Sequence, residues 1–280
     1  MAIITISRKI ASLGDETAKE LANNLNYKFI TRKMIEEDLI KRGISEETLK
    51  QYDEKKPGFW ASLSRNRDKY FDYLRETVYE YGENTNCIFI GRGGFAILKD
   101  VPGCYSVRLV SPDNVRLKRL MTEFNWSEQQ AKKLILESDE NREGFHKCFF
   151  NVVNEDPTFY DMVLNTGAIT AQTAAEIIRS GFEKTIGIES EEASHKYIAN
   201  RLLGQRIVNK IAFEEKLQIF FLDAEVCNDK IILHGIIEES NLVDKAVEIA
   251  KELSNGKTVV SEINYVNNYR ANSKNMSIQP

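Results

Sequence analysis

The chain has 280 residues, of which 42% are hydrophobic and 29% are charged, and its formal net charge is −4. These values are ordinary for a globular protein that builds its own core. The acidic balance supplies no overall basic field, so no nucleic-acid partner is expected. No apolar run approaches the roughly 18 residues that a membrane-spanning helix needs, so no transmembrane segment is expected either.

The first residues lead directly into an apolar strand, without the basic region and apolar stretch of a signal peptide. The four cysteines, at positions 87, 104, 148 and 227, lie far apart and form no paired motif. We therefore expect reduced thiols and a cytoplasmic protein. His146 and Cys148 are close in sequence but have no second pair of ligands, so no metal site is predicted.

Strands and helices alternate through the first two thirds of the chain. Residues 3–7 predict a buried strand, and residues 15–25 predict a helix with one apolar face. A strand in NYKFI is expected next, followed by helices over 32–41, after Ser45 and over 60–81. Strands are then expected in CIFI and CYSVRLV, followed by helices that begin at Ser111-Pro112 and at the capping box Ser127/Gln130. The last two elements are a strand in YDMVLNT and a helix in TAQTAAEIIRSGF.

Such alternation predicts an α/β domain with a parallel sheet and helices on both faces. Ligands of these sheets bind beyond the carboxyl ends of the strands. Two unusual strand exits fall there, residues 7–14 and the turn GRGG at 91–94. Arg116 and Arg119 stand one turn apart on a helix that follows the next strand.

The pattern changes after residue 186, where we place the end of the first domain. The acidic stretch 187–192 is the expected linker, and residues 268–280 are expected to be a polar tail. Between them, residues 193–267 predict a small α+β domain of order αββαβ. Its first two strands are expected to form a hairpin that turns at Asn228-Asp229.

The loop after the first strand can be compared with the P-loop pattern GxxxxGK[ST], whose backbone and lysine hold phosphates. Arg8 and Leu13 stand at the two glycines and Gly14 at the lysine. On this motif alone, a strand–turn–helix without a ligand is the better explanation. Four arginines and lysines at one sheet edge favour a site, although surface solvation or ion pairing is the alternative.

The ordered blocks ITISR, GDETAKELANNLNYKFITR, FIGRGGFAIL, VRLVSPDNVRLKRLM, SDENREGF and YDMVLNTGAI resemble the cytidylate kinase-like family over residues 1–186. This resemblance implies a P-loop nucleoside monophosphate kinase-like fold. The family loop commonly has an arginine followed by Gly-Ser-Gly-Gly, and the corresponding run here is Ala11-Ser12-Leu13-Gly14. Asp15 replaces a residue that is usually basic, whereas Glu16 fits the family pattern.

The resemblance also implies roles for individual residues. The residues implied at the nucleotide phosphates are Arg8, Lys9, Ser12, Gly14 and Glu16. The residues implied at the monophosphate are Arg32, Arg92 and Asp139, and those implied to clamp the transferring phosphoryl group are Arg116, Arg119 and Arg142. ATP and Mg²⁺ are the implied cofactors. Because the start of a helix favours anions, Asp15 is expected either to take the place of a phosphate or to hold Mg²⁺ with Glu16. Gly93 and Thr31 stand where the family commonly has acids.

The C-terminal region resembles a BON domain, on the hairpin FLDAEVCNDKIILHGII, the helix with Ala246 and Ala250, and the strand in GKTVVSEINYV. BON domains are linked to phospholipid or small-ligand binding. No basic amphipathic face suits anionic lipid here, so we expect a protein or small-ligand partner. A structural extension or a homodimer contact is the equal alternative.

Two functional hypotheses follow. The first is a phosphotransferase that moves a phosphoryl group from a nucleoside triphosphate to a monophosphate such as CMP. The second is a catalytically inactive nucleotide or anion sensor that acts through the BON-like domain, because Leu13, Asp15 and the missing lysine weaken the loop. A scaffold without nucleotide binding is the third alternative.

Overall fold

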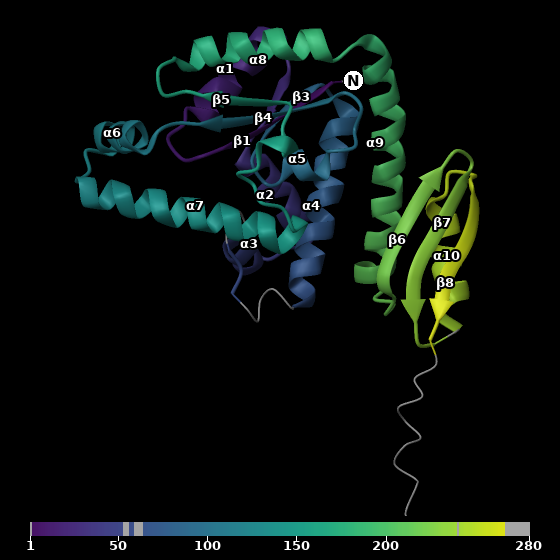
Figure 1. Cartoon of the computed structure of the whole chain (residues 1–280). Coiled ribbons are helices and arrows are strands. Elements are labelled where there is room, and N and C mark those ends of the chain that lie inside the picture. Colours follow the sequence, from purple (N-terminus) through teal and green to yellow (C-terminus); the bar gives the residue numbers. More distant parts are fainter. Residues whose placement is uncertain (1, 53–55, 59–63, 240, 267–280) are drawn as a thin grey trace, which may run out of the picture. The chain divides into compact units, whose positions relative to one another are not determined.

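The structure is a computed structural model, and it describes residues 2–52, 56–58, 64–239 and 241–266 (Figure 1). The chain divides into two compact units, Met1–Ala199 and Asn200–Pro280. The boundary falls within one helix, α9 (Ile188–Asn209). Among the described residues, no helix has the length and apolar character to cross a membrane.

The first unit is built on a five-stranded sheet with the strand order β2-β3-β1-β4-β5. Every neighbouring pair in it is parallel, so the carboxyl ends of all the strands lie at one edge. The strands are β1 (Ile3–Arg8), β2 (Lys28–Ile30), β3 (Cys87–Ile90), β4 (Cys104–Val110) and β5 (Met162–Asn165). The predicted parallel α/β architecture is confirmed, and β1 is its central strand.

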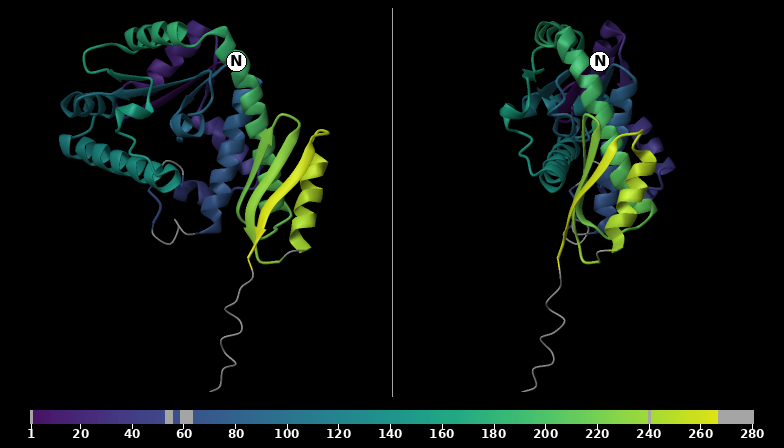
Figure 2. Two further views of the ribbon diagram at one scale, coloured as in Figure 1. Left: turned by 45° about the vertical axis from the view of Figure 1, so that its right-hand side comes forward. Right: turned by 90° about the vertical axis from the view of Figure 1, so that its right-hand side faces the viewer.

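Helices cover both faces of this sheet. They are α1 (Gly14–Leu25), α2 (Arg32–Lys41), α3 (Glu46–Tyr52), α4 (Arg65–Asn84), α5 (Gly94–Ile97), α6 (Asp113–Phe124), α7 (Glu128–Phe150) and α8 (Ala171–Thr185). Figures 1 and 2 show α1 and α8 on one face, with α4, α5 and α7 on the other.

The two faces of the central strands carry different side chains because neighbouring strand residues point in opposite directions. Ile4 and Ile6 of β1, with Val107 and Leu109 of β4, pack into the core beneath α1 and α8. Towards the carboxyl ends, the alternate positions carry the buried polar side chains Thr5, Ser7, Ser106 and Arg108. The apolar face anchors the sheet, whereas the polar face leads towards the carboxyl edge.

Helix α7 is longer than its sequence pattern suggested. Ser127 begins it with the predicted capping box, and the helix continues through the polar stretch SDENREG to Phe150. Phe145, His146 and Phe149 are buried in its last turns. Phe149 packs against an aromatic pair, Tyr52 and Tyr70, whose ring centroids lie 5.7 Å apart. This packing explains why a polar stretch remains helical.

Two other boundaries differ from those expected. Residues 188–192, placed in a linker on their acidic character, form the first turns of α9. The buried Ser194 of this helix accepts a hydrogen bond from the Gly103 amide at 2.6 Å and donates one to the Ser190 carbonyl. The long helix expected over 60–81 is described from Arg65, and the polar tail expected over 268–280 lies outside the described residues.

The second unit has the expected αββαβ order. After α9 and a π-helical turn at Lys210–Glu214, it contains β6 (Phe220–Cys227), β7 (Lys230–Ile237), α10 (Asn241–Leu253) and β8 (Thr258–Tyr265). The predicted hairpin joins β6 and β7 antiparallel, with Asn228 in a left-handed conformation, and β8 pairs parallel with β7. The core of this unit includes Ile211, Leu233 and Ala250.

Candidate functional site

The loop between β1 and α1, residues 9–13, lies at the carboxyl end of the central strand. Its backbone is unusual because two residues with side chains adopt left-handed conformations, Ala11 with φ 57° and Leu13 with φ 59°. Non-glycine residues avoid this region, since Cβ then crowds the following carbonyl. These two positions match the glycines of the family loop pattern.

Side chains hold four consecutive carbonyl groups of this loop. Ser12 Oγ donates to the Lys9 carbonyl at 2.7 Å, Arg116 Nε to Ile10 at 2.9 Å, Arg119 Nη1 to Ala11 at 3.0 Å, and Thr166 Oγ1 to Ser12 at 3.0 Å. The donors come from the loop itself, from α6 and from the end of β5. They fix the direction of every peptide group along the loop.

The amide N–H groups of the same stretch are available to a ligand. Within the described part of the chain, the N–H groups of residues 10–16 donate no hydrogen bond. The first of these belong to the loop and the last to the first turn of α1, where helix geometry leaves amides without partners. The result is a run of backbone donors beside the positive end of a helix dipole, which favours an anion.

A cavity of about 430 Å³ lies against this loop. Arg8, Lys9 and Arg142 contribute its basic side chains, and Asp15 and Glu16 its acids at the start of α1. A Cβ atom on Gly14 would come within 2.7 Å of Cγ of Arg8, so the absence of a side chain lets Arg8 lie across the start of α1. Four of the five predicted phosphate-binding residues therefore line one cavity: Arg8, Lys9, Gly14 and Glu16.

Arg116 supports the loop from within the protein. Its side chain is 0% exposed, and its Nη1 and Nη2 donate to both carboxylate oxygens of Asp139, at 2.9 and 2.8 Å. Nη1 also contacts Asp113, and Nε holds the Ile10 carbonyl. This guanidinium joins α6, α7 and the loop, and Asp139 is its counter-ion.

Arg119 also holds the loop through hydrogen bonds to backbone carbonyls. Its Nη2 donates to the Thr166 carbonyl at 2.7 Å, while Nη1 holds the Ala11 carbonyl. The hydroxyl of the fully buried Ser12 is likewise committed to the Lys9 and Leu109 carbonyls, so Ser12 can offer a ligand only its amide. Of the three arginines implied to clamp a phosphoryl group, Arg142 lines the cavity, one turn after Ser138, to which its Nη1 donates.

A second cluster lies after β3 and in α2. Arg92 is 2% exposed, has a left-handed backbone at φ 52°, and contacts Oε1 of Glu36 at 3.2 Å through Nη2. The exposed Arg32 contacts the same oxygen at 2.8 Å through Nε. Sequence reasoning did not identify Glu36, although its position four residues after Arg32 predicts a helical ion pair.

Three further residues were not predicted: Arg108, Asn154 and Glu155. With Arg8, Lys9 and Arg142 they line a smaller cavity next to the loop. Lys9 Nζ lies 2.7 Å from Glu155, and this hydrogen bond lowers the pKa of the Glu155 carboxyl. An arginine in a strand that otherwise packs into the core was the available signal.

Comparison with known families gives two matches. Residues 3–168 match the model of the cytidylate kinase-like family, and residues 201–267 match that of the BON domain. The first match covers more than half of the chain. The chain belongs to the cytidylate kinase-like family. Its second unit is a BON domain.

A solved structure shares the fold of the kinase-like unit. An uncharacterized protein from Eubacterium ventriosum superposes with a TM-score of 0.52 at 19% identity, over 65% of this chain and 99% of that one. Shikimate kinase from Bacteroides thetaiotaomicron (TM-score 0.40, 14% identity, 65% of this chain and 95% of that one) and dephospho-CoA kinase from Campylobacter jejuni (TM-score 0.34, 14% identity, 66% and 97%) are more distant.

One curated relative matches a short stretch. Uronate isomerase from Corynebacterium glutamicum is 26% identical over 91 residues, which are 32% of this chain. The match spans only 18% of the length of that relative.

The structure explains one departure from the family pattern. A Cβ atom at Gly93, where cytidylate kinases have an acid, would lie 2.2 Å from Cζ of Phe150. Gly93 also has φ 69°, which disfavours any side chain. The last residue of α7 therefore occupies the space in which that acid would stand.

The donors at the loop fit the phosphates of a nucleotide, since the open amides and Arg8, Lys9 and Arg142 surround one cavity. The P-loop lysine and the hydroxyl that holds Mg²⁺ have no counterpart in this chain. Asp15 and Glu16 are exposed carboxylates that could ligate Mg²⁺ together with phosphate oxygens and waters. Among the described residues, no group of three or more His, Cys, Asp or Glu side chains forms a metal cluster.

Proposed function

We propose that this chain is a nucleotide phosphotransferase, which binds a nucleoside triphosphate at the loop after β1 and phosphorylates a nucleoside monophosphate. The observation that carries the proposal is the orientation of the loop. Its carbonyls are held by Ser12, Arg116, Arg119 and Thr166, while the amides over residues 10–16 are open. Phosphoryl transfer depends mostly on positioning and charge stabilisation, and preorganised amides supply both.

The roles that we propose differ between the basic residues. Arg8, Lys9 and Arg142 line the cavity and would neutralise phosphate charge in place of the missing lysine. Arg116 and Arg119 would act as positioning residues, since they hold the loop. Asp15 and Glu16 would hold Mg²⁺, which lowers the repulsion between phosphate oxygens when bound.

We propose that the acceptor phosphate binds at Arg92 and Arg32, with CMP as the first candidate. Both arginines share Glu36 as their counter-ion, and Arg92 follows the strand next to β1. A dianionic phosphate would compete with the Glu36 carboxylate for these guanidinium groups. The space that Phe150 occupies next to Gly93 supports an acceptor contact different from that of the cytidylate kinases.

A steady-state assay of ADP release with MgATP and a panel of nucleoside monophosphates tests this proposal. The Arg142→Ala variant should lose roughly 10²–10³-fold in kcat, the usual effect of removing one preorganised charge donor. Arg179→Ala, an exposed arginine on α8, removes the same charge and should leave the rate unchanged. No acceptor-dependent ADP release from the wild-type protein would rule out the catalytic role.

A specific observation favours the second candidate, a nucleotide sensor without turnover. The two arginines that would clamp a phosphoryl group, Arg116 and Arg119, each donate from both Nη1 and Nη2 to protein oxygens. A melting temperature that rises with MgATP in the absence of ADP release would establish this role. The BON domain would then pass the signal to a protein or small-ligand partner, or to a second copy of the chain, in the cytoplasm.

A further inference from the structure

A small cavity adjoins the loop cavity on the polar face of the sheet. Its volume is about 90 Å³, and it is lined by Arg8, Lys9, Arg108, Asp139, Arg142, Glu143, Asn154 and Glu155. Since liquid water takes roughly 30 Å³ per molecule, this volume corresponds to about three waters. The cavity can therefore hold one tetrahedral or planar oxyanion group.

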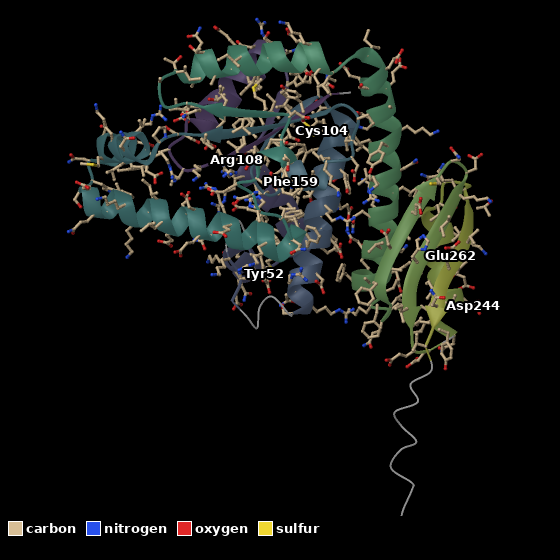
Figure 3. All side chains as sticks on the ribbon, viewed as in Figure 1. Tyr52, Cys104, Arg108, Phe159, Asp244 and Glu262 are labelled. Atoms are coloured by element: carbon tan, nitrogen blue, oxygen red, sulfur yellow. The ribbon has the colours of Figure 1, made fainter. Side chains whose placement is uncertain are left out.

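Arg108 is the buried charge of this cavity. Its side chain is only 3% exposed, and Figure 3 shows it between the sheet and α7. Nη1 donates to neutral oxygens, the hydroxyls of Ser7 at 3.1 Å and Tyr160 at 3.4 Å. The guanidinium also lies 5.6 Å from the centroid of the Tyr160 ring. None of these contacts supplies a negative charge.

The Glu155 carboxylate is near Arg108 but too far away to form a hydrogen bond with it. Oε1 of Glu155 lies 3.8 Å from Nη2, beyond the usual range of about 2.7–3.2 Å. Removing a guanidinium from water is costly unless close charge-assisted hydrogen bonds replace the lost hydration. Arg108 is therefore a buried cation with room for a closer anion.

Asn154 gives a second, independent observation. This residue is 5% exposed, and its Oδ1 has no hydrogen-bond partner among the described residues. Buried polar atoms are nearly always paired, so an unpaired one on a cavity wall indicates a missing ligand group. An oxygen acceptor there suits a hydroxyl or protonated oxygen of the ligand.

Glu155 behaves as an internal substitute for that ligand. Its side chain is 59% exposed, so it can leave the cavity without disturbing the core, yet its carboxylate lies 2.7 Å from Lys9 and faces Arg108. Two further acids line the cavity from α7: Asp139 is already bound through both oxygens to Arg116, and Glu143 is exposed. Glu155 is thus the exchangeable negative charge between Lys9 and Arg108.

We propose that this cavity is a second oxyanion-binding site, which takes a phosphate or carboxylate group on Arg108 and Lys9 and displaces the Glu155 carboxylate. When the group is hydrogen phosphate, its P–O–H donates a hydrogen bond to Asn154 Oδ1, which a carboxylate cannot do. The site is distinct from the loop, because Arg108, Asn154 and Glu155 line this cavity and not the loop cavity. It does not depend on whether the chain transfers a phosphoryl group.

Titration calorimetry with inorganic phosphate, at constant ionic strength, tests the site on the full chain. Glu155→Gln removes the competing carboxylate and should lower the phosphate Kd at least about threefold. Glu128→Gln is the matched control, since Glu128 is 57% exposed and also forms an ion pair with a lysine, Lys132. It should leave the Kd unchanged. An unchanged or weaker affinity in Glu155→Gln would overturn the proposal.

Arg108→Met removes the anchoring charge at similar size and should raise the phosphate Kd about tenfold or more, the effect of losing a charge-assisted hydrogen bond. If this variant does not fold, the Glu155→Gln comparison still decides. Phosphate held only at the loop would respond to neither change, which would also overturn the proposal.

The same titrations with acetate distinguish the two sources of the oxyanion. Acetate binding that strengthens in Glu155→Gln assigns the site to carboxylates as well, and binding of phosphate alone assigns it to phosphate groups. Either pattern supports the site, and no binding of either anion overturns it. The MgATP melting shift is measured separately, so failure of nucleotide binding and failure of this site remain distinguishable.

Discussion

At the residue scale, the loop contains backbone strain that the surrounding side chains stabilise. Ala11 and Leu13 are left-handed, a conformation that costs an L-residue roughly 1–2 kcal/mol. Arg119 donates a hydrogen bond to the Ala11 carbonyl, and Thr166 donates one to the carbonyl of Ser12, which lies between the two left-handed residues. The hydrogen bonds therefore oppose relaxation of the peptide groups to the right-handed region.

Ala11→Gly is expected to raise the free energy of unfolding by about 0.5–1 kcal/mol, because relief of strain exceeds the added entropy of the unfolded chain. Ala11→Val should lower it by about 2 kcal/mol, since a β-branched residue is more hindered at positive φ. Urea denaturation measures both changes. Destabilisation by glycine would show that the left-handed backbone is not strained.

Substitution of Arg116 is expected to lower the stability of the protein strongly, although Arg116 does not line the loop cavity. Arg116→Lys keeps a charge but loses the fork that binds both oxygens of Asp139, leaving a buried carboxylate with poor geometry. We expect a loss of about 3 kcal/mol or more in the free energy of unfolding. Asp113→Asn, at the 80% exposed partner of Arg116, should cost less than about 0.5 kcal/mol in the same assay.

Glu155 should make the stability of the first unit depend on pH. Its pKa lies below the ordinary 4.5, first because of the hydrogen bond from Lys9. A lowered folded pKa stabilises the protein above the unfolded pKa, and this stability is lost as the pH falls through the folded value. Wild-type protein should therefore exceed Glu155→Gln in melting temperature near neutral pH, and the difference should shrink below about pH 4.5. A constant difference would contradict the ion pair.

The sequence identified the correct loop but not the task of every side chain. Arg8, Lys9 and Arg142 line the predicted cavity, since position along the chain sets which sheet edge a residue reaches. The direction of a guanidinium is set by its neighbours. For Arg116 those neighbours include Asp139, 23 positions away, which no local pattern connects to it. Arg108 was missed because strand periodicity does not distinguish a buried cation from a solvated one.

At the element scale, caps and apolar faces were predicted better than helix ends. Ser127 and Gln130 form the predicted capping box, which a four-residue pattern specifies locally. The far end of α7 depends on the aromatic packing of Phe149 with Tyr52 and Tyr70, and these contacts join distant parts of the chain. The same contacts place Arg142 and Asp139 on one continuous helix.

A close approach between elements gives a test in the second unit. A Cβ atom on Gly204 of α9 would lie 2.2 Å from the Ala224 carbonyl oxygen in β6. Gly204→Ala must therefore separate the helix from the strand, and we expect a loss of about 1–3 kcal/mol. Gly187→Ala is the control, because no atom lies within 4 Å of its Cβ position. Equal stability of the two variants in thermal denaturation would contradict the packing.

At the scale of the whole molecule, the change in element order after residue 186 correctly indicated a second domain. The boundary was harder to predict because α9 is continuous from Ile188 to Asn209 and contributes to both units. Ile198 packs near Gly82 in the first unit, and Ile207 belongs to the core of the second. Its acidic start resembled a linker, since composition alone does not reveal that Ser194 is buried in the first unit.

The open amides of the loop also determine how fast that segment exchanges hydrogen for deuterium. In the described part of the chain, the amide N–H groups of residues 10–16 donate no hydrogen bond, so their exchange requires no opening of the fold, whereas β1 exchanges through unfolding. A phosphate seated on these amides would slow them without changing β1. Mass spectrometry of one peptide that covers residues 10–16 would thus report directly when the loop is occupied.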